Sequence, residues 1–447
     1  MVKERSLDGN MGKGQQGQSS AQVSKKNTYT WDEVKEHSSK TDKWVVIENG
    51  VYDVSKWVTR HPGGFKVLSH YAGEDATDAF VAFHPDKELV TKYLKPLCIG
   101  SLEKDNKPKS SIVTDMRNLR SKVEQLNLLK PNLWFYAAHL GHILALDVLG
   151  WFVMWYFGTG WLPYLTSAFL LLVVQGQSGW FQHDLGHLSV FKKSSWNHAL
   201  HGFILGGMKG SSAHWWNYRH FQHHAKPNII MKDPDIRMEY IFMLGEKQPV
   251  QWAKKKKGFM PYDHQQSYFF FILPPLLLPL YFHYEYTSHI LRKKVWIDVF
   301  WMVFFFTKLF VTFGPLLGVS GAFFFYLFVR FMESHWFVWV TQMNHIPMKI
   351  DYDDKKEWLP MQLQATCNVD PSFFNDWFTG HLNYQIEHHL FPTMPRHNFH
   401  KIVPDVKALC RKHGLPYQTK TLFCAFADIV RSLKRSGEIW HDAYYHT

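Results

Sequence analysis

Long apolar stretches alternate along this chain with polar, histidine-rich stretches. A helix needs about 20 mainly apolar residues to cross a bilayer. Residues 161–182 carry no charged side chain, and a Gly-Thr-Gly turn joins them to the apolar stretch before. Residues 296–307 contain Asp298 and are expected to lie at the membrane interface. Four segments are predicted to span a membrane, namely residues 133–157, 161–182, 268–284 and 309–329.

The polar stretches divide the rest of the chain. Residues 1–28 are rich in Gly, Gln, Ser and Lys, and a disordered tail on the cytosolic side is expected there. Residues 29–103 predict a compact α+β domain, in which Asn49-Gly50 lies between two β-rich runs and indicates a hairpin. Residues 104–130 are predicted to be a linker followed by an amphipathic helix, and residues 131–447 an α-helical membrane domain.

Composition narrows the class of protein further. The 447 residues include only four cysteines, none in a CxxC spacing, so neither a disulfide framework nor a cysteine zinc site is expected. A net charge of +12 is compatible with nucleic acid, an anionic membrane or a phosphorylated substrate as partner. The apolar segments favour the last two, and nucleic acid is not an expected partner. The 27 histidines matter most, because many form tight clusters of the kind that bind metals.

Two histidines of the N-terminal region form the first candidate site. His61 begins the sequence His-Pro-Gly-Gly, and His84 follows 23 residues later. Haem held by two histidines needs one neutral imidazole on each face of the porphyrin. Glycines next to one ligand let the backbone approach the ring edge. Residues 29–103 therefore resemble cytochrome b5, which implies haem b, His61 and His84 as axial ligands, and transfer of single electrons.

Three further motifs combine histidines at helical spacing. They read HDLGH, HFQHH and QIEHH in chain order. Spacings of three and four residues place side chains on one helix face, and imidazoles suit iron better than magnesium or calcium. Seven histidines exceed what one tetrahedral metal needs, so a two-metal centre is predicted. His345 and His381 are expected to complete the metal shell. The predicted catalytic ligands in the three motifs are His183, His187, His220, His223, His224, Gln385, His388 and His389.

The predicted spans are compatible with one shared centre. Two crossings precede the first motif, and two separate the second motif from the third. All three motifs and the haem domain then lie on the same membrane face, as electron transfer between them requires. Asp147, within the first span, is expected either to be functional or to pair with a neighbouring helix. His198, His201 and His214 are expected to form hydrogen bonds or to face the substrate.

With these motifs in this order, the chain resembles an animal front-end fatty acid desaturase with a fused cytochrome b5 domain. The phrases SHWFVWVTQMNHIPM and GHLNYQIEHHLFPTMPRHN are close to vertebrate acyl-CoA Δ6 and Δ5 desaturases. The resemblance implies O2-dependent insertion of a cis double bond into a fatty acyl-CoA by two non-haem irons. It also implies electrons from NADH through cytochrome b5 reductase. The expected location is the endoplasmic reticulum membrane, with the haem domain and the histidine motifs facing the cytosol.

The position of the new double bond is less well defined. Ser212, Arg219 and Gln248 resemble Δ6 members, whereas the turn at 315–318 and residues 426–430 resemble Δ5 members. Residues near the metal are given more weight, so Δ6 is favoured, with a Δ5 or bifunctional enzyme as the alternative.

The sequence also allows alternative activities and more than one role for two basic regions. A sphingolipid desaturase, a fatty acid hydroxylase and a non-catalytic electron-carrying membrane protein are the remaining alternatives. Positive charge for CoA phosphates is offered by Lys254–Lys257 and by Arg396, although the lysine run equally fits attraction to the membrane surface.

Overall fold

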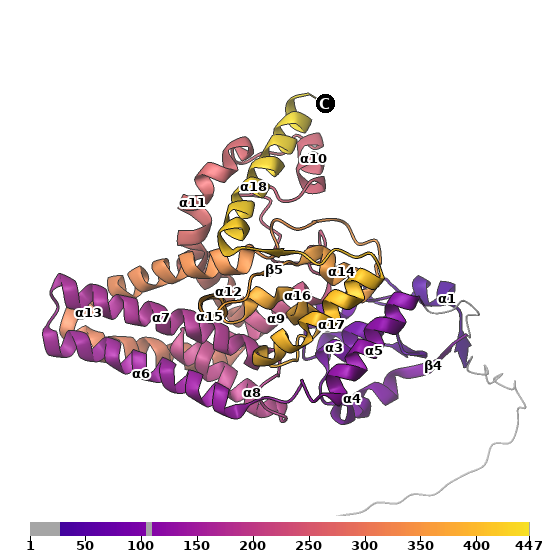
Figure 1. The fold of residues 1–447 in the computed structure, drawn as a ribbon, viewed down its shortest axis with the longest axis horizontal. Coiled ribbons are helices and arrows are strands. Elements are labelled where there is room, and N and C mark those ends of the chain that lie inside the picture. The colour runs from indigo at the N-terminus through magenta and orange to yellow at the C-terminus, as the bar shows by residue number, and fades with distance from the viewer. Residues whose placement is uncertain (1–26, 104–109, 447) are drawn as a thin grey trace, which may run out of the picture.

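The computed structural model describes residues 27–103 and 110–446, and Figure 1 shows them as two joined parts. A small domain with a sheet lies at one end, and an elongated helical bundle extends from the other. Most of the predicted tail and residues 104–109 of the predicted linker lie outside the described residues.

The N-terminal part is a four-stranded sheet with short helices. Its strands are β1 (Thr28–Tyr29), β2 (Trp44–Ile47), β3 (Gly50–Asp53) and β4 (Cys98–Leu102), in the order β1-β4-β3-β2. The predicted hairpin is confirmed, because β2 and β3 pair antiparallel with Ile47 opposite Gly50. The positive φ falls on Glu48, however, and Gly50 is a strand residue. The helices of this part are α1 (Trp31–Glu36), α2 (Phe65–Ser69), α3 (Thr77–Phe83) and α4 (Lys87–Leu94).

An antiparallel helix pair begins the bundle. After α5 (Ser111–Gln125), α6 (Leu133–Phe157) and α7 (Trp161–Gly186) are joined by a turn in which Gly158 has φ 83°. The two helices lie close together at Gly150 of α6. Its carbonyl accepts a 2.6 Å hydrogen bond from Ser167 Oγ of α7.

A second helix pair differs from the sequence expectation. Helix α13 (Trp296–Gln342) reverses at Gly318, which has φ 72° and ψ 167°. Rings on the two arms face each other, since the centroids of Phe313 and Phe325 are 5.1 Å apart. Residues 309–329 are therefore the tip of a helical hairpin and not one span. Residues 296–307, expected at the interface, belong to its first arm. Figure 1 shows α6, α7 and α13 side by side.

The first arm is tied to α6 by an ion pair. Lys308 Nζ lies 2.7 Å from Asp147 Oδ2, and both side chains are about a quarter exposed. Of the two roles expected for Asp147, the structure shows the pairing with a neighbouring helix.

The segment expected to span at 268–284 is interrupted. It consists of α11 (Gln265–Leu276), a π-helical stretch η5 (Leu277–Phe282) and α12 (His283–Lys293). The interruption coincides with Pro274, Pro275 and Pro279, each of which removes a helical N–H. At its end, Lys293 Nζ lies 5.8 Å from the ring centroid of Phe65 in α2. The end of α12 therefore lies beside the N-terminal domain.

Among the described residues, three helices are long and apolar enough to cross a membrane: Leu133–Phe157, Tyr262–Lys293 and Trp296–Gln342. Helix α7 is not one of them, although residues 161–182 carry no charge. Its second half contains the buried amides of Gln175, Gln177 and Gln182, which lower its hydropathy. This half faces protein, so its polarity needs no contact with lipid.

The remaining elements cover the inner end of the bundle. They include a short parallel pair, β5 with β6, that joins distant parts of the chain. The elements are α8 (Ser194–His201), η3 (Gly202–Met208), α9 (Ala213–Ala225), α10 (Lys247–Lys254), η4 (Tyr262–His264), α14 (Trp358–Ala365), β5 (Asn368–Val369), α15 (Phe373–Thr379), η6 (Leu382–Tyr384), α16 (Gln385–Leu390), η7 (Arg396–Asn398), α17 (Phe399–Lys412), β6 (Thr419–Lys420) and α18 (Leu422–Tyr445).

The two parts are packed into one core. Tyr71 Oη donates a 2.8 Å hydrogen bond to the carbonyl of Ala225, at the end of α9. Lys226 follows in the chain and is only 1% exposed, yet its Nζ lies 2.9 Å from Glu74 and 3.1 Å from Asp353. A buried cation needs such partners, since burying an unpaired charge is costly. The haem-type domain is therefore held in place by a buried ion pair.

Reversal of one charge in this pair is expected to destabilise the protein. Lys226→Glu places a carboxylate beside Glu74 and Asp353, and breaking a buried pair typically costs about 3–5 kcal/mol. The melting temperature in detergent is expected to fall clearly, and the double variant Glu74→Lys/Lys226→Glu should recover part of the loss. The control is Lys35→Glu, because Lys35 is 55% exposed in its pair with Asp32 and such pairs contribute little. An unchanged melting temperature for Lys226→Glu would contradict the interpretation.

Candidate metal centre and haem site

Three helices deliver the histidine motifs to one place. His183 lies near the end of α7 and His187 caps it, while α9 carries His220, His223 and His224. Helix α16 carries Gln385, His388 and His389. Each motif is helical, as the spacing predicts, and the three helices meet at the inner end of the bundle (Figure 1).

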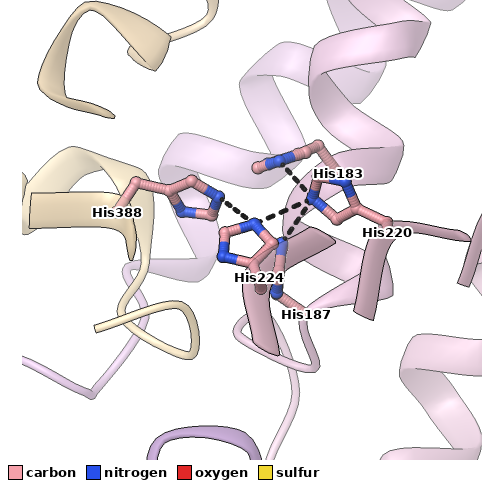
Figure 2. A group of neighbouring side chains, drawn as sticks. All are labelled: His183, His187, His220, His224 and His388. Atoms are coloured by element: carbon pink, nitrogen blue, oxygen red, sulfur yellow. Dashed lines mark hydrogen bonds between the residues drawn. The ribbon is translucent and has the colours of Figure 1, made fainter. Parts of the chain in front are cut away.

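Five of these histidines form the first group. The possible ligand atoms of His183, His187, His220, His224 and His388 all lie within 4.8 Å of one another. Figure 2 shows the five rings directed towards a common point. His220 Nε2 is 3.0 Å from His183 Nε2, 2.9 Å from His187 Nε2 and 3.1 Å from His224 Nε2.

This arrangement fits a metal better than a hydrogen-bond network. Burial lowers the pKa of His220 and of His224 well below the usual value, so both rings are neutral. A neutral imidazole has one N–H and one lone pair. One His220 nitrogen therefore cannot serve three neighbouring nitrogens at once. A cation between them would accept all the lone pairs together.

Three more histidines form a second group beside the first. His223, His345 and His389 also bring their ligand atoms within 4.8 Å. In each ring Nδ1 donates a hydrogen bond: from His223 to Asp233 at 2.9 Å, from His345 to the Ala365 carbonyl at 3.0 Å, and from His389 to Gln362 at 2.9 Å. These bonds place the proton on Nδ1 and direct Nε2 to the shared centre. Although burial opposes it, the Asp233 carboxylate raises the pKa of His223, so this ring would give up a proton when a metal binds.

At the second group, two buried polar atoms have no hydrogen-bond partner among the residues that the structure describes. One is His389 Nε2 and the other is Gln385 Oε1. Gln385 Nε2 lies 2.7 Å from His345 Nε2, so the amide touches this group. The structure thus brings Gln385 and His345 to the metal site, where the sequence analysis expected them. Buried atoms of this kind normally have partners, and a metal would supply one.

His381 does not join either group, contrary to the sequence expectation. Its ring lies 5.9 Å from that of Phe135 in α6, between centroids. The expectation assumed a helix from His381 to Gln385. Residues 382–384 instead form a 3₁₀ turn, and His381 has φ 67°, so α16 begins only at Gln385.

Arg396 also differs from the expectation that it binds CoA phosphates. Its side chain is only 2% exposed, and its Nε lies 3.2 Å from Asp184 Oδ2. Asp184 is part of the first motif, between His183 and His187. Arg396 therefore neutralises a buried carboxylate next to the metal ligands and is not available to an external phosphate.

The other histidines near the site form hydrogen bonds. His201 Nε2 is 2.7 Å from Gln182 Oε1, and His214 Nδ1 is 2.9 Å from Asp298. These contacts agree with the hydrogen-bonding alternative of the sequence analysis.

Sequence analysis missed several residues that support the ligands. Asp233 and Gln362 fix the proton on two metal-binding imidazoles, and only their three-dimensional neighbours reveal this. Gly186 also supports a ligand, because it leaves room for a neighbouring ring. A Cβ at this position would lie 2.2 Å from the ring of Trp216. Trp216 stacks on His220 with centroids 4.1 Å apart. A glycine inside the first motif was a visible signal, since it allows this close approach.

The haem-type domain presents its two histidines to each other. The ring centroids of His61 and His84 are 6.0 Å apart. His84 Nδ1 donates a 2.8 Å hydrogen bond to the Phe80 carbonyl, which leaves Nε2 for a metal. Burial lowers the pKa of His61 to about 4, so the ring is neutral. Both rings therefore fit axial ligation of haem.

Aromatic side chains connect the two sites. Phe83 precedes His84, and its ring centroid lies 6.1 Å from that of Phe221. The ring of Phe221 in turn lies 6.2 Å from that of His187. The chain neighbour of a haem ligand and a metal ligand are thus joined through the ring of Phe221.

A cavity of about 600 Å³ reaches the metal site from the other side. Its walls include ligands of both histidine groups, such as His220 and His345, together with Gln385. The remaining wall is mainly apolar and aromatic, with Trp180, Phe242, Leu277, Phe282, Phe337 and Val340.

Comparison with known proteins agrees with this geometry. The model of the fatty acid desaturase family matches residues 159–421, which is more than half of the chain. The chain belongs to the fatty acid desaturase family. A model of the cytochrome b5-like haem/steroid binding domain matches residues 30–103. Among solved structures, the cytochrome b5 of Ostreococcus tauri virus 2 is 35% identical, covers 17% of this chain and 95% of its own, and gives a TM-score of 0.16.

The family assignment identifies the chemistry of the two sites. This desaturase is an oxygen-dependent oxidoreductase with a fused haem domain. The residues described above fit two non-haem irons in the two histidine groups and one haem between His61 and His84. The irons, when bound, supply the oxidising power that breaks unactivated C–H bonds. The eight imidazoles of the two groups would hold them in mostly buried surroundings.

Gly186→Ala is expected to disturb the metal site. The added methyl group would push Trp216 away from its stacking position on His220 and so displace a ligand. Non-haem iron per chain should fall by at least about half, while the haem spectrum stays normal, because overpacking forces neighbouring groups to shift. The matched control is Gly141→Ala in α6, where a Cβ meets nothing within 4 Å. Equal iron content in both variants would show that Gly186 has no such role.

Loss of one ligand should affect one site only. His388→Ala removes a ring of the five-histidine group, and His84→Ala removes a haem ligand. Metal analysis is expected to show reduced non-haem iron with normal haem for His388→Ala. The reverse pattern is expected for His84→Ala, since its ring lies outside both groups. Loss of both cofactors from either variant would indicate global misfolding and contradict separate sites.

Proposed function

We propose that this desaturase is a front-end enzyme that introduces a cis double bond into polyunsaturated fatty acyl-CoA, with Δ6 position favoured. The observation that carries the proposal is the apolar cavity that passes both metal groups, in a chain with its own haem domain. The cavity suits an unbranched acyl chain, because aromatic and aliphatic walls bury apolar surface and exclude water. The alternative is a Δ5 or bifunctional Δ6/Δ5 enzyme.

The stoichiometry explains the fused domain. Each double bond removes two hydrogens from the chain and reduces O2 to two waters. This needs two more electrons and two protons. The haem passes electrons one at a time, and its attachment to the same chain gives it a high effective concentration at the metal site. The proposed source is NADH, through cytochrome b5 reductase.

The placement of the subtype residues supports Δ6. Arg219 lines the cavity and is held by Asp235 at 3.0 Å. Ser212 bonds to Asp298 and caps α9, which carries the second motif. The Δ5-like turn at 315–318 lies at the tip of the α13 hairpin. Arg219 and Ser212 can therefore influence where the chain meets the metals. The Δ5-like residues 426–430 lie in α18, where Phe426 packs against Trp339 at 5.4 Å between centroids.

We propose a topology with four crossings in the endoplasmic reticulum membrane: α6, α7 and the two arms of α13. The number of crossings between the second and third motifs must be even, because both motifs reach one site. The hairpin of α13 supplies two, so residues 262–293 do not cross. The contact between Lys293 and Phe65 supports this, since it keeps the end of α12 on the side of the haem domain. The histidine motifs, the haem domain and the basic end of α12 then all face the cytosol, which agrees with the positive-inside rule.

Product analysis tests the activity and separates it from a hydroxylase or a sphingolipid desaturase. The full chain is expressed in a yeast that lacks polyunsaturated lipids and is fed 18- and 20-carbon polyunsaturated acids. The expected product has lost two hydrogens, with a new bond between the carboxyl end and the existing ones. A gain of one oxygen, or a product only in sphingolipid, would overturn the proposal.

Gln385 offers a sharper test of the same chemistry. Gln385→Ile keeps the bulk but removes the amide that touches His345, and we expect product formation to fall by at least about tenfold through loss of this polar contact. Gln385→His returns an imidazole and should give reduced but detectable product. The protein level and the haem absorbance serve as controls. Normal product from Gln385→Ile at equal protein level would show that the amide has no role at the metal.

A further inference from the structure

A seam between the haem domain and the desaturase domain lies close to the cavity. On one side is α2, with Phe65 and Lys66, and on the other are α9 and the end of α12. A Cβ at Gly64 would lie 3.0 Å from the ring of Tyr218, so the two surfaces are in contact. The ring centroids of Phe65 and Tyr218 are 6.4 Å apart.

Four cations belong to this seam: Lys66 of α2, Arg292 and Lys293 in the last turn of α12, and Arg237, whose charge acts on Lys66. Lys66 Nζ lies 5.9 Å from the ring centroid of Tyr218, and Lys293 Nζ lies 5.8 Å from that of Phe65. Burial lowers the pKa of Lys66, and the nearby guanidinium groups of Arg237 and Arg219 lower it further.

These four cations lack acidic partners. Within residues 27–103 and 110–446, no carboxylate lies within 4.0 Å of any of the four. The neighbouring Arg219 differs, because it pairs with Asp235 at 3.0 Å and with Glu285 at 3.7 Å. Like charges repel, so a cluster of this kind is stabilised when an anion binds between them.

The cluster reaches the apolar cavity through one of its members, Arg237. Arg237 is exposed and belongs to the cavity wall. Among the other wall residues, Tyr240, Leu280 and Tyr284 are the most exposed, at 64%, 59% and 70%. The wall is buried near the histidines and open near Arg237. A ligand that fits has an apolar chain for the interior and an anionic head for the entrance.

We propose that the phosphate-bearing head of the acyl substrate binds in this seam, between Lys66 of the haem domain and Arg237, Arg292 and Lys293 of the desaturase domain. The inference rests on the proposed function, since it takes the acyl chain in the cavity as given. Arginine and lysine both bind phosphate oxygens through charge-assisted hydrogen bonds. The lysine run at 254–257, considered from the sequence, is not part of this cluster.

A head bound in this way contacts both domains. It would hold the haem domain where Phe83 meets Phe221 and therefore favour electron delivery when substrate is present. Without substrate, the repulsion between Lys66 and the three other cations weakens the seam. The haem domain thereby takes part in substrate binding as well as in electron transfer.

The test uses the full chain with haem and iron bound, and the variant Lys66→Glu. We expect the KM for acyl-CoA to rise by about tenfold or more, because a phosphate contact is replaced by repulsion, while kcat changes less than about threefold. Binding of CoA without an acyl chain, measured by equilibrium dialysis, should weaken by a similar factor. The matched control is Lys92→Glu, an exposed lysine of α4 that should leave both quantities unchanged.

Two further arms separate the sources of the phosphate and guard against misfolding. Weaker binding to vesicles with phosphatidic acid, with unchanged CoA binding, would assign the seam to a lipid head. Weaker CoA binding would assign it to the CoA moiety. Arg237→Gln should reproduce the effect of Lys66→Glu, and haem and iron contents verify the fold. If neither variant alters CoA or vesicle binding, the proposal is wrong. If the unaltered protein forms no product from acyl-CoA, the proposed function fails instead.

Discussion

Eight imidazoles share one buried volume, and most of the structure serves to make this possible. To bind a metal, each ring must keep no more than one proton, and that proton must point away from the metal. In the second group the acceptors are Asp233, Gln362 and the Ala365 carbonyl, so residues far apart in the chain determine which nitrogen stays free. The proton positions, and not only the presence of histidine, make the site suitable for iron.

The course of the chain through the membrane places a second requirement on the metal site. The ligands come from α7, α9 and α16, which are separated by apolar helices in the chain. They can meet only if the chain returns to the same side before each motif. In the proposed topology two helical hairpins achieve this, one turning at Gly158 and the other at Gly318. Both glycines have positive φ, which other residues adopt at a cost. The metal site therefore depends on two backbone positions at the far ends of the bundle.

Local motifs could be predicted from the sequence better than the places where the chain turns. The three motifs with Gln385 could be predicted because spacing on a helix is a local property, and the haem histidines because His-Pro-Gly-Gly is a local motif. His381 was misplaced because a 3₁₀ turn breaks that spacing. The span expected at 309–329 was wrong because hydropathy does not register a reversal at Gly318. Arg396 was misjudged since only the fold shows that Asp184 lies beside it.

The ion pair between Asp147 and Lys308 has a consequence for how the protein is made. The two residues are 161 positions apart, so α6 is synthesised long before its partner exists. In the proposed topology, α6 enters the lipid with an uncompensated carboxyl group, which is costly in a membrane. The first hairpin is therefore incomplete until α13 arrives beside it. In this topology the second hairpin stabilises the first, because only Lys308 supplies the partner that Asp147 has in the folded bundle.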